Sequence, residues 1–321
     1  NGALIMKFGF TVPVNGAGAN PQGIAEIAGA AESYGYSYIA VNDHVVVPRD
    51  IHSLYPYTDD GMWPGRTGDY LEPLSLIGFL SGVTKKIDLL TSILVIPYRP
   101  PILAAKMISS LDVMSDGRLI LGIGAGWMRE EFEAVGAPDF GARGKVTDEY
   151  IGAFRTLWRE ENPSFHGTYV EFEKIIFQPK PVQENGPRIW VGGEGRAARR
   201  RVANLGDGWY PVGNNPQVPL DTIDRYVAGQ REVSNLAVAN GRADASIDFA
   251  YWAIWPWTGE AETATDGTRR LLTGSGQDLI DDVRRLEDAG VSHLSIMVLS
   301  EGVEGTVKNI KHFADEVMAR T

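Results

Sequence analysis

The chain has 321 residues, of which 44% are hydrophobic and 22% charged, a composition typical of a globular protein. It contains no cysteine, which excludes disulfides, thiolate nucleophiles, zinc–thiolate sites and iron–sulfur clusters. The net charge of −11 argues against a basic nucleic-acid surface, and no apolar run approaches the roughly 20 residues of a membrane span. We therefore expect a cytoplasmic protein with no nucleic-acid or membrane partner. Residues 1–5 are expected to be a short tail or an expression remnant outside the fold.

From Met6 onward, short apolar runs alternate with helical stretches. The predicted strands span residues 7–12, 38–42, 87–96, 119–124, 188–192, 208–212, 247–254 and 293–298. The predicted helices span residues 21–34, 71–83, 101–115, 128–135, 146–160, 197–205, 220–240, 277–289 and 303–319. Apolar strands alternating with helices predict a parallel sheet covered on both faces, and eight such units indicate a closed (β/α)8 TIM barrel. We expect one domain over residues 1–321, with a doubly wound open sheet as the structural alternative.

Three segments interrupt this alternation: residues 48–70, 162–187 and 256–275. The first and third follow the carboxyl ends of predicted strands, where barrel enzymes place active-site loops and lids. The middle segment precedes a strand, and its run HGTYVEFEKIIF alternates around a Gly-Thr turn, which predicts a small hairpin.

The second predicted strand ends in Asn42-Asp43-His44. Histidine titrates near neutral pH and can act as an acid, a base or a hydrogen-bond donor, so His44 and the adjacent Asp43 are candidate catalytic residues. Successive strand residues point to opposite faces, which predicts that Asp43 does not contact the His44 ring. A purely structural pair is the alternative, but the position at the carboxyl end of a strand favours function.

The third predicted strand carries Thr91-Ser92-Ile93 within otherwise apolar sequence. Small hydroxyl residues at this place indicate a backbone irregularity, and a bulge would bring the backbone against a flat ligand. Hydrogen bonds from Thr91 and Ser92 to neighbouring strands are an equally good interpretation.

Residues 118–136 predict a strand, a glycine-rich turn and a helix, a junction at which α/β enzymes hold ligands. Gly122, Gly124 and Gly126 would let another backbone or a ligand approach closely. The pattern is not a dinucleotide fingerprint, because the third glycine of GxGxxG and the acidic residue about 20 positions on are missing. A glycine-tolerant turn without a ligand is the alternative.

The fifth unit, PRIWVGGEGRAARRR, joins a strand to a glycine-rich loop and then to a helix. Backbone amides at a helix N-terminus, the positive end of the helix dipole and a nearby arginine together form a phosphate site. The amides of residues 193–196 are the expected donors, and barrel phosphate sites often lie in the loops after later strands. A solvated basic helix face is the alternative interpretation.

Aromatic residues gather at or near the predicted strand ends: Trp63, Tyr70, Tyr98, Trp127, Trp209, Trp255 and Trp257. In loops at the barrel mouth such rings can wall a pocket for a planar ligand. No group of His, Asp and Glu has metal-ligand spacing, so we expect no catalytic metal; an organic cofactor that carries redox chemistry is the better interpretation.

The chain resembles the bacterial luciferase-like superfamily of flavin and deazaflavin oxidoreductases. The segments that carry the resemblance, in order, are VNDHVVVP, LLTSILVIPYRPPILAAK, LDVMSDGRLILGIGAGWMREEFEAVG, TDEYIGAFRTLW, PRIWVGGEGRAARRRVANLGDGWYP and DDVRRLEDAGVSHLSI. The resemblance covers nearly the whole chain and implies a (β/α)8 barrel that binds FMN, or its 5-deaza analogue coenzyme F420, in the mouth.

The resemblance also implies roles for individual residues. His44 would lie near the reactive part of the cofactor ring, with Asp43 beside it. Ser92 and Ile93 match a bulge, often with a non-proline cis peptide, that supports the middle ring from behind. The residues expected to line the ring edge and the ribityl chain are Ala125, Gly126 and Trp127. Those that match the phosphate loop are Gly192, Gly193, Glu194, Gly195 and Arg196.

One departure concerns Trp127, which stands where sugar-phosphate dehydrogenases of the deazaflavin branch carry a glutamate proton donor. Sugar oxidation is therefore in doubt, and neither Glu130 nor Glu131 is assumed to replace that donor. The acidic total charge also disfavours the polyglutamate tail of F420, although Arg99, Arg196 and Arg199 would offset this if they line the mouth.

The sequence thus predicts an oxidoreductase that uses F420 or FMN for hydride transfer to, or monooxygenation of, a small organic substrate beneath residues 48–70 and 256–275. A flavin or F420 reductase and a second copy of the chain, in a homodimer, are the expected partners. A non-catalytic flavin-binding barrel is the alternative. A cofactor-free lyase or aldolase is a third class, but the strand ends carry neither a lysine for a Schiff base nor a set of metal carboxylates.

Overall fold

The computed structural model describes residues 5–65, 68–243 and 246–321. Residues 1–4 of the predicted terminal tail, and positions 66–67 within the predicted lid segment, therefore lie outside the described residues. Ile5, the last residue of that tail, is exposed.

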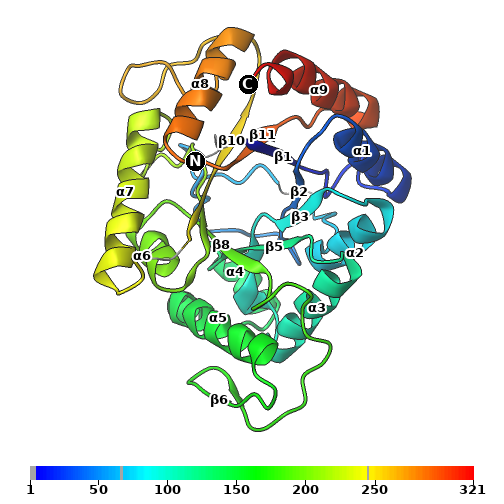
Figure 1. The fold of residues 1–321 in the computed structure, drawn as a ribbon, viewed down its shortest axis with the longest axis vertical. Coiled ribbons are helices and arrows are strands. Elements are labelled where there is room, and N and C mark those ends of the chain that lie inside the picture. The colour runs from blue at the N-terminus through cyan, green and yellow to red at the C-terminus, as the bar shows by residue number, and fades with distance from the viewer. Residues whose placement is uncertain (1–4, 66–67, 244–245) are drawn as a thin grey trace.

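The strands form a closed parallel barrel, which confirms the predicted TIM barrel (Figure 1). They are β1 (Lys7–Thr11), β2 (Tyr38–Val41), β3 (Asp88–Thr91) with β4 (Leu94–Val95), β5 (Leu119–Gly124), β8 (Arg188–Gly192), β9 (Gly208–Tyr210), β10 (Asp248–Pro256) and β11 (His293–Met297). The sheet runs in the order β3-β2-β1-β11-β10-β9-β8-β5-β4, and the pairing of Leu89 with Leu119 closes it. β3 and β4 occupy one place in the barrel, so the closed sheet has the eight predicted strand positions.

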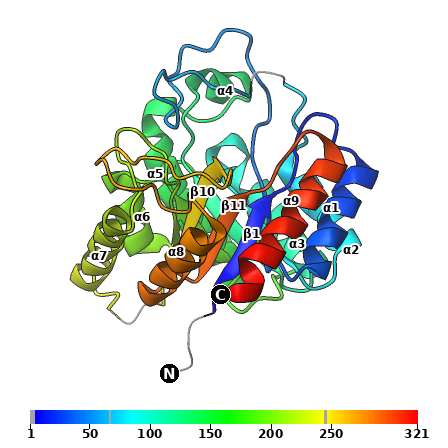
Figure 2. The ribbon, with the colours of Figure 1, turned by 90° about the horizontal axis from the view of Figure 1, so that it is seen from above.

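Among the described residues, eight helices surround the barrel, and each overlaps a predicted helical stretch (Figure 1). They are α1 (Pro21–Ser33), α2 (Pro73–Val83), α3 (Pro101–Met114), α5 (Arg143–Arg159), α6 (Arg196–Leu205), α7 (Ile223–Ala239), α8 (Gly276–Asp288) and α9 (Gly302–Glu316). Local signals fix several of their starts. Asn20 caps α1 by accepting a hydrogen bond from the Gly23 N–H, and Ser275 forms a capping box with Asp278. The short helix α4 (Arg129–Ala134) lies at one end of the barrel (Figure 2).

Strand alternation divides the apolar residues into two layers. Side chains such as Phe10, Ile39 and Leu89 point outward and form the large core between sheet and helices. Inward-pointing side chains fill the barrel itself: Tyr38, Ala40, Leu90, Trp190, Tyr210, Val212, Ala250 and Trp252. Residues that continue the inward positions toward the carboxyl ends of the strands therefore face the mouth.

The predicted hairpin is present as β6 (Phe165–His166) and β7 (Glu171–Phe172), which pair antiparallel. The Glu149 carboxylate on α5 ties it to the barrel by accepting hydrogen bonds from the N–H groups of Thr168, Tyr169 and Val170. Three short 3₁₀ helices complete the described structure: Ile96–Tyr98, Phe140–Ala142 and Met318–Arg320. Among the described residues, no helix has both the length and the apolar character needed to cross a bilayer.

Candidate functional site

The floor of the barrel mouth is formed by Ile93. The Ser92–Ile93 peptide is cis and separates β3 from β4, as the resemblance implied. A side chain at Gly124, at the end of β5, would collide with the Ile93 side chain, and one at Gly192, at the end of β8, would crowd it. The two glycines are therefore required for Ile93 to reach across the mouth. Packing of Ile93 thus explains why glycine stands at both strand ends.

His44 is held at the end of β2 by a glutamate from a distant part of the chain. Glu131, on α4, is fully buried, and its Oε2 lies 2.8 Å from His44 Nδ1. The same carboxylate accepts hydrogen bonds from Tyr98 OH at 3.0 Å and from the N–H groups of Val45 and Val46 at 2.7 and 3.2 Å. Because a carboxylate oxygen accepts, the arrangement places a proton on Nδ1 and directs Nε2 away from Glu131.

Asp43 points away from His44, as strand alternation predicts, and forms an ion pair of its own. Its two carboxylate oxygens lie 2.8 and 2.9 Å from the Arg99 guanidinium, and one also accepts the Val95 N–H at 2.8 Å. Arg99 additionally contacts Glu72 at 2.8 Å. Burial raises the pKa of Asp43, and its hydrogen bonds to Arg99 act in the opposite direction. The pair fixes the loop after β2 to the segment after β4, so the geometry shows a structural contact for Asp43.

Aromatic rings enclose His44. Its imidazole lies 4.3 Å from the Trp63 ring and 5.2 Å from the Tyr70 ring, measured between centroids. Trp127 lies 6.4 Å from His44 and 5.1 Å from Tyr55. These rings come from the 48–70 segment and from the end of β5, and together they form a wall on the His44 side of the mouth.

The turn that carries Trp127 depends on a glycine with a left-handed backbone. Gly126 has φ +82°, and a side chain there would also crowd Phe132 and Val95. Ala125 and Gly126 are partly exposed, and the Gly126 carbonyl accepts a hydrogen bond from Arg143 Nε at 3.2 Å. The predicted lining segment is thus brought to the mouth.

The 48–70 segment is attached to the same helix that holds His44. The Glu130 carboxylate accepts hydrogen bonds from the N–H groups of His52 and Ser53 at 2.9 and 3.1 Å, and the Arg129 N–H donates to Ser53 Oγ at 3.0 Å. Figure 2 shows this segment in blue beside α4. Tyr57 packs against the residues inside the barrel, so the described part of the segment covers the mouth.

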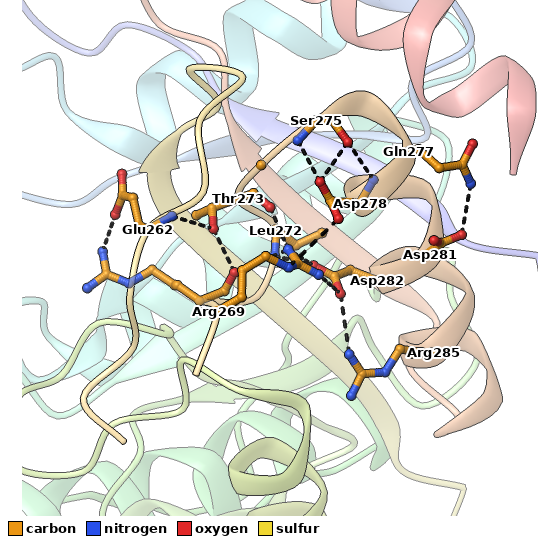
Figure 3. Close-up of polar contacts among 12 residues, drawn as sticks. Glu262, Arg269, Leu272, Thr273, Ser275, Gln277, Asp278, Asp281, Asp282 and Arg285 are labelled. Carbon is orange, nitrogen blue, oxygen red and sulfur yellow. Dashed lines mark hydrogen bonds and ion pairs between the residues drawn. The ribbon is translucent and has the colours of Figure 1, made fainter. Parts of the chain in front are cut away.

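The second predicted lid, residues 256–275, is bound to α8 (Figure 3). Asp282 is fully buried and accepts hydrogen bonds from Arg269 at 2.8 and 2.7 Å and from the Leu272 N–H at 2.7 Å. The Arg285 guanidinium lies 3.5 Å from the same carboxylate. The contacts therefore hold the 256–275 segment against α8.

The predicted phosphate loop leads from β8 into α6. Gly193 has φ +103°, which favours glycine, and Gly195 is the N-cap of α6 without a side-chain cap. The Glu194 side chain turns inward, where its carboxylate accepts the Val212 N–H at 2.8 Å and the Asn215 amide at 2.9 Å. Burial raises the pKa of Glu194. The first amides of α6 thus remain the donors expected for a phosphate.

Two of the three arginines that were expected to offset the charge of a polyanionic cofactor have acidic partners. Arg99 binds Asp43 and Glu72, and Arg199 binds Glu232. Arg196 is exposed at the start of α6.

The mouth suits a ligand that is both flat and polar. Thr11 Oγ1, Asn42 Oδ1 and Trp252 Nε1 are buried and have no hydrogen-bond partner among the described residues. Unsatisfied buried polar atoms are uncommon in proteins, and here Thr11 ends β1, Asn42 follows β2 and Trp252 lies on β10. The residues present therefore fit an isoalloxazine-type ring, with its apolar face and polar edge.

The sequence interpretation identified the strand ends but not the partners that orient them. It gave no role to Glu131, and it considered Arg99 only as a free charge. Local sequence spacing cannot reveal the His44–Glu131 contact or the Asp43–Arg99 contact, because the partners lie 87 and 56 residues apart. The position of Glu131 in the predicted helix directly after the glycine-rich turn was the available hint.

The fold is a TIM barrel whose mouth is walled by aromatic rings and carries the His44–Glu131 pair. The chain belongs to the luciferase-like monooxygenase family, whose model matches residues 6–292. An uncharacterized protein of Mycobacterium tuberculosis is 31% identical over 303 residues, covering 92% of this chain and 94% of that protein. An FMNH2-dependent dimethylsulfone monooxygenase of Pseudomonas putida is 31% identical over 174 residues, covering 54% of this chain and 46% of that enzyme.

Solved structures show the same fold. Monooxygenase RslO1 from Streptomyces bottropensis superimposes with a TM-score of 0.75 at 19% identity, covering 98% of this chain and 99% of that one. A coenzyme F420-dependent tetrahydromethanopterin reductase from Methanopyrus kandleri gives a TM-score of 0.74 at 15% identity, with 98% and 99% coverage. An F420-dependent secondary alcohol dehydrogenase, solved with an F420-acetone adduct, gives 0.75 at 18% identity, with 99% of each chain covered.

Proposed function

We propose that the protein is an oxidoreductase that binds FMN or coenzyme F420 in the barrel mouth and transfers a hydride to, or oxygenates, a small organic substrate. The observation that carries the proposal is the His44–Glu131 pair, which lies beside the aromatic wall at the mouth. Family membership and the cofactors named for the related proteins support it.

Different residues of the chain would contact different parts of the cofactor. Ile93 and the Ser92–Ile93 backbone would lie behind the ring, and Ala125 to Trp127 would line its edge. The amides of residues 193–196 would bind the phosphate. When bound, the cofactor supplies the hydride or the activation of oxygen, which none of the side chains at the mouth can supply.

His44 would move the proton that accompanies this chemistry. Its Nδ1 is occupied by Glu131, so Nε2 is the atom that can give a proton to, or take one from, the reacting group. The Trp63 and Trp127 rings would exclude water from this exchange, and the covering 48–70 segment would close the site over the substrate.

Fluorescence titration of the purified protein with FMN and, separately, with F420 tests the proposal. Micromolar or tighter binding of one cofactor is expected, and binding of neither would refute the proposal. Tight F420 binding directs the search to hydride donors and acceptors, whereas tight FMN binding directs it to oxygen-dependent turnover with a flavin reductase.

His44→Ala should lower turnover by about 100-fold or more with cofactor affinity retained, and His52→Ala, at an exposed position on the lid, is the matched control. A cofactor that binds tightly but supports no turnover with any donor or acceptor would instead indicate a non-catalytic flavin-binding barrel.

We also propose a homodimer formed through α2 and α3. These packed helices expose several large apolar side chains: Phe79, Val83, Ile102, Leu103, Val113 and Met114. Leu103→Glu should then shift sedimentation toward the monomer, whereas Ile176→Glu, at an exposed position outside these helices, should not.

We propose in addition that the protein is cytoplasmic, which the cysteine-free composition supports.

A further inference from the structure

Four hydroxyl groups inside the barrel form a hydrogen-bonded chain. Tyr38 OH lies 2.8 Å from Ser295 Oγ, and Ser295 Oγ lies 2.7 Å from Tyr210 OH. Tyr210 OH lies 3.2 Å from Ser92 Oγ. All four residues are buried. The chain leads from Tyr38, at the start of β2, to Ser92, at the cis peptide that forms the floor of the mouth.

The two ends of this chain are not equivalent. Each hydroxyl has one proton to donate, and three hydrogen bonds use three of the four protons. The remaining proton can belong to any of the four residues, because a hydroxyl oxygen can accept two hydrogen bonds. On Ser295 or Tyr210 it would be a buried O–H with no acceptor outside these four residues among the described residues, which is unfavourable. Tyr38 is fully buried, and Ser295 is the one hydrogen-bond partner of its hydroxyl among the described residues. A free O–H there would be a buried donor without an acceptor, which is unfavourable.

The favoured direction therefore has Tyr38 donating to Ser295, Ser295 to Tyr210, and Tyr210 to Ser92. In this arrangement the hydroxyl protons of Tyr38, Ser295 and Tyr210 are all donated within these four residues. Ser92, whose oxygen is already engaged as an acceptor, keeps its own O–H for a group in the mouth.

Two unsatisfied polar atoms lie on or beside β1 and β2, the two strands that come after β3 in the sheet order. Thr11 Oγ1, at the end of β1, and Asn42 Oδ1, just after β2, are buried without a partner among the described residues. The register pairs Thr11 with Ala40, and Val41 with Thr91, so the three positions lie on adjacent strands near the same end of the barrel. One side of the mouth is thus polar and incompletely hydrogen-bonded.

We infer that Ser92 donates a hydrogen bond to an acceptor atom on the edge of the bound cofactor ring, and that Thr11 and Asn42 meet the same edge. Tyr210 and Ser295 are positioning residues, because they act through the direction that they impose on the Ser92 hydroxyl. The inference rests on the proposed flavin-type cofactor, whose ring edge carries carbonyl oxygens and ring nitrogens.

Titration with FMN and F420, together with the absorption spectrum of the bound cofactor, tests the proposed hydrogen bond from Ser92. Ser92→Ala should weaken binding of whichever cofactor the wild type binds by roughly two- to tenfold, the value of one hydrogen bond, and should shift the absorption maximum. Tyr210→Phe should lower the cofactor affinity by a smaller factor than Ser92→Ala. The double variant should bind no more weakly than Ser92→Ala, because Tyr210 acts through Ser92.

Tyr36→Phe is the matched control, since it removes a buried tyrosine hydroxyl that donates to the Ile310 carbonyl outside the barrel interior. It should leave both affinity and spectrum unchanged. Should Ser92→Ala fold poorly, Ser92→Cys, which keeps a side chain but offers a weak donor, should reproduce the loss.

Wild-type affinity and spectrum in Ser92→Ala, or in Ser92→Cys, would overturn the inference while leaving the proposed function intact. Additive losses in the double variant would overturn the positioning role of Tyr210. Binding of neither cofactor by the wild type would overturn the proposed function and this inference with it.

Discussion

Glu131 on α4 holds His44 at the end of β2 through a 2.8 Å hydrogen bond between Oε2 and Nδ1, although 87 residues separate the two in the chain. The same carboxylate accepts the N–H groups of Val45 and Val46, so it fixes both the imidazole and the backbone that follows it. One buried side chain thus determines the geometry of the candidate acid–base residue.

Glu131→Gln should lower kcat by at least about tenfold and change the KM for substrate much less, because an amide cannot hold Nδ1–H and both N–H groups as a carboxylate does. Steady-state kinetics measure this. Glu133→Gln, at an exposed position on the same helix, is the control and should match the wild type. Wild-type kcat in Glu131→Gln would refute the orienting role.

Asp43→Asn should destabilise the protein by roughly 3–5 kcal/mol, because it leaves the buried Arg99 guanidinium without its bidentate partner. Urea unfolding measures the loss, and Asp50→Asn at an exposed position should be nearly neutral. If turnover per folded molecule survives in Asp43→Asn, Asp43 is structural. If turnover is abolished at unchanged stability, the catalytic assignment made from the sequence stands.

Gly124→Ala should destabilise the protein by about 1–3 kcal/mol and weaken cofactor binding, because the added methyl group collides with Ile93. The double variant with Ile93→Ala should recover part of the stability, and the size of that coupling is the test. Gly29→Ala on α1, where the added methyl group meets no neighbour within 4 Å, should instead stabilise by up to about 1 kcal/mol.

Burial lowers the pKa of His293, at the start of β11, from 6.5 to about 3. The folded protein therefore keeps this imidazole neutral, while the unfolded chain takes up a proton below pH 6.5. Its contribution to stability is present above pH 6.5 and is lost as the pH falls toward 3.

When the pH falls from 7.5 to 5, the free energy of unfolding of the wild type should decrease by about 2 kcal/mol more than that of His293→Gln. Urea unfolding at the two pH values measures the difference, with His52→Gln, at an exposed position, as the control. Equal pH dependence in His293→Gln and wild type would contradict this assignment.

The sequence by itself determined the barrel and the location of its mouth. Strand and helix periods depend on neighbours a few residues apart, so the alternation of apolar runs was sufficient to predict the strands and the helices that follow them. The same local logic placed His44 and Gly192 at strand ends and turned Asp43 away from His44, whereas Ser92 was expected inside a strand that the structure interrupts after Thr91.

The tertiary structure alone decided which side chains meet at that mouth. The contact of His44 with Glu131 depends on how α4 packs over the barrel, and the chain from Tyr38 through Ser295 to Tyr210 joins three strands that are distant in sequence. Such contacts leave no local pattern, because a buried carboxylate or hydroxyl finds its partner through the closure of the whole sheet. The positions of the strand ends thus follow from local periodicity, whereas the side-chain contacts at the mouth follow from closure of the barrel.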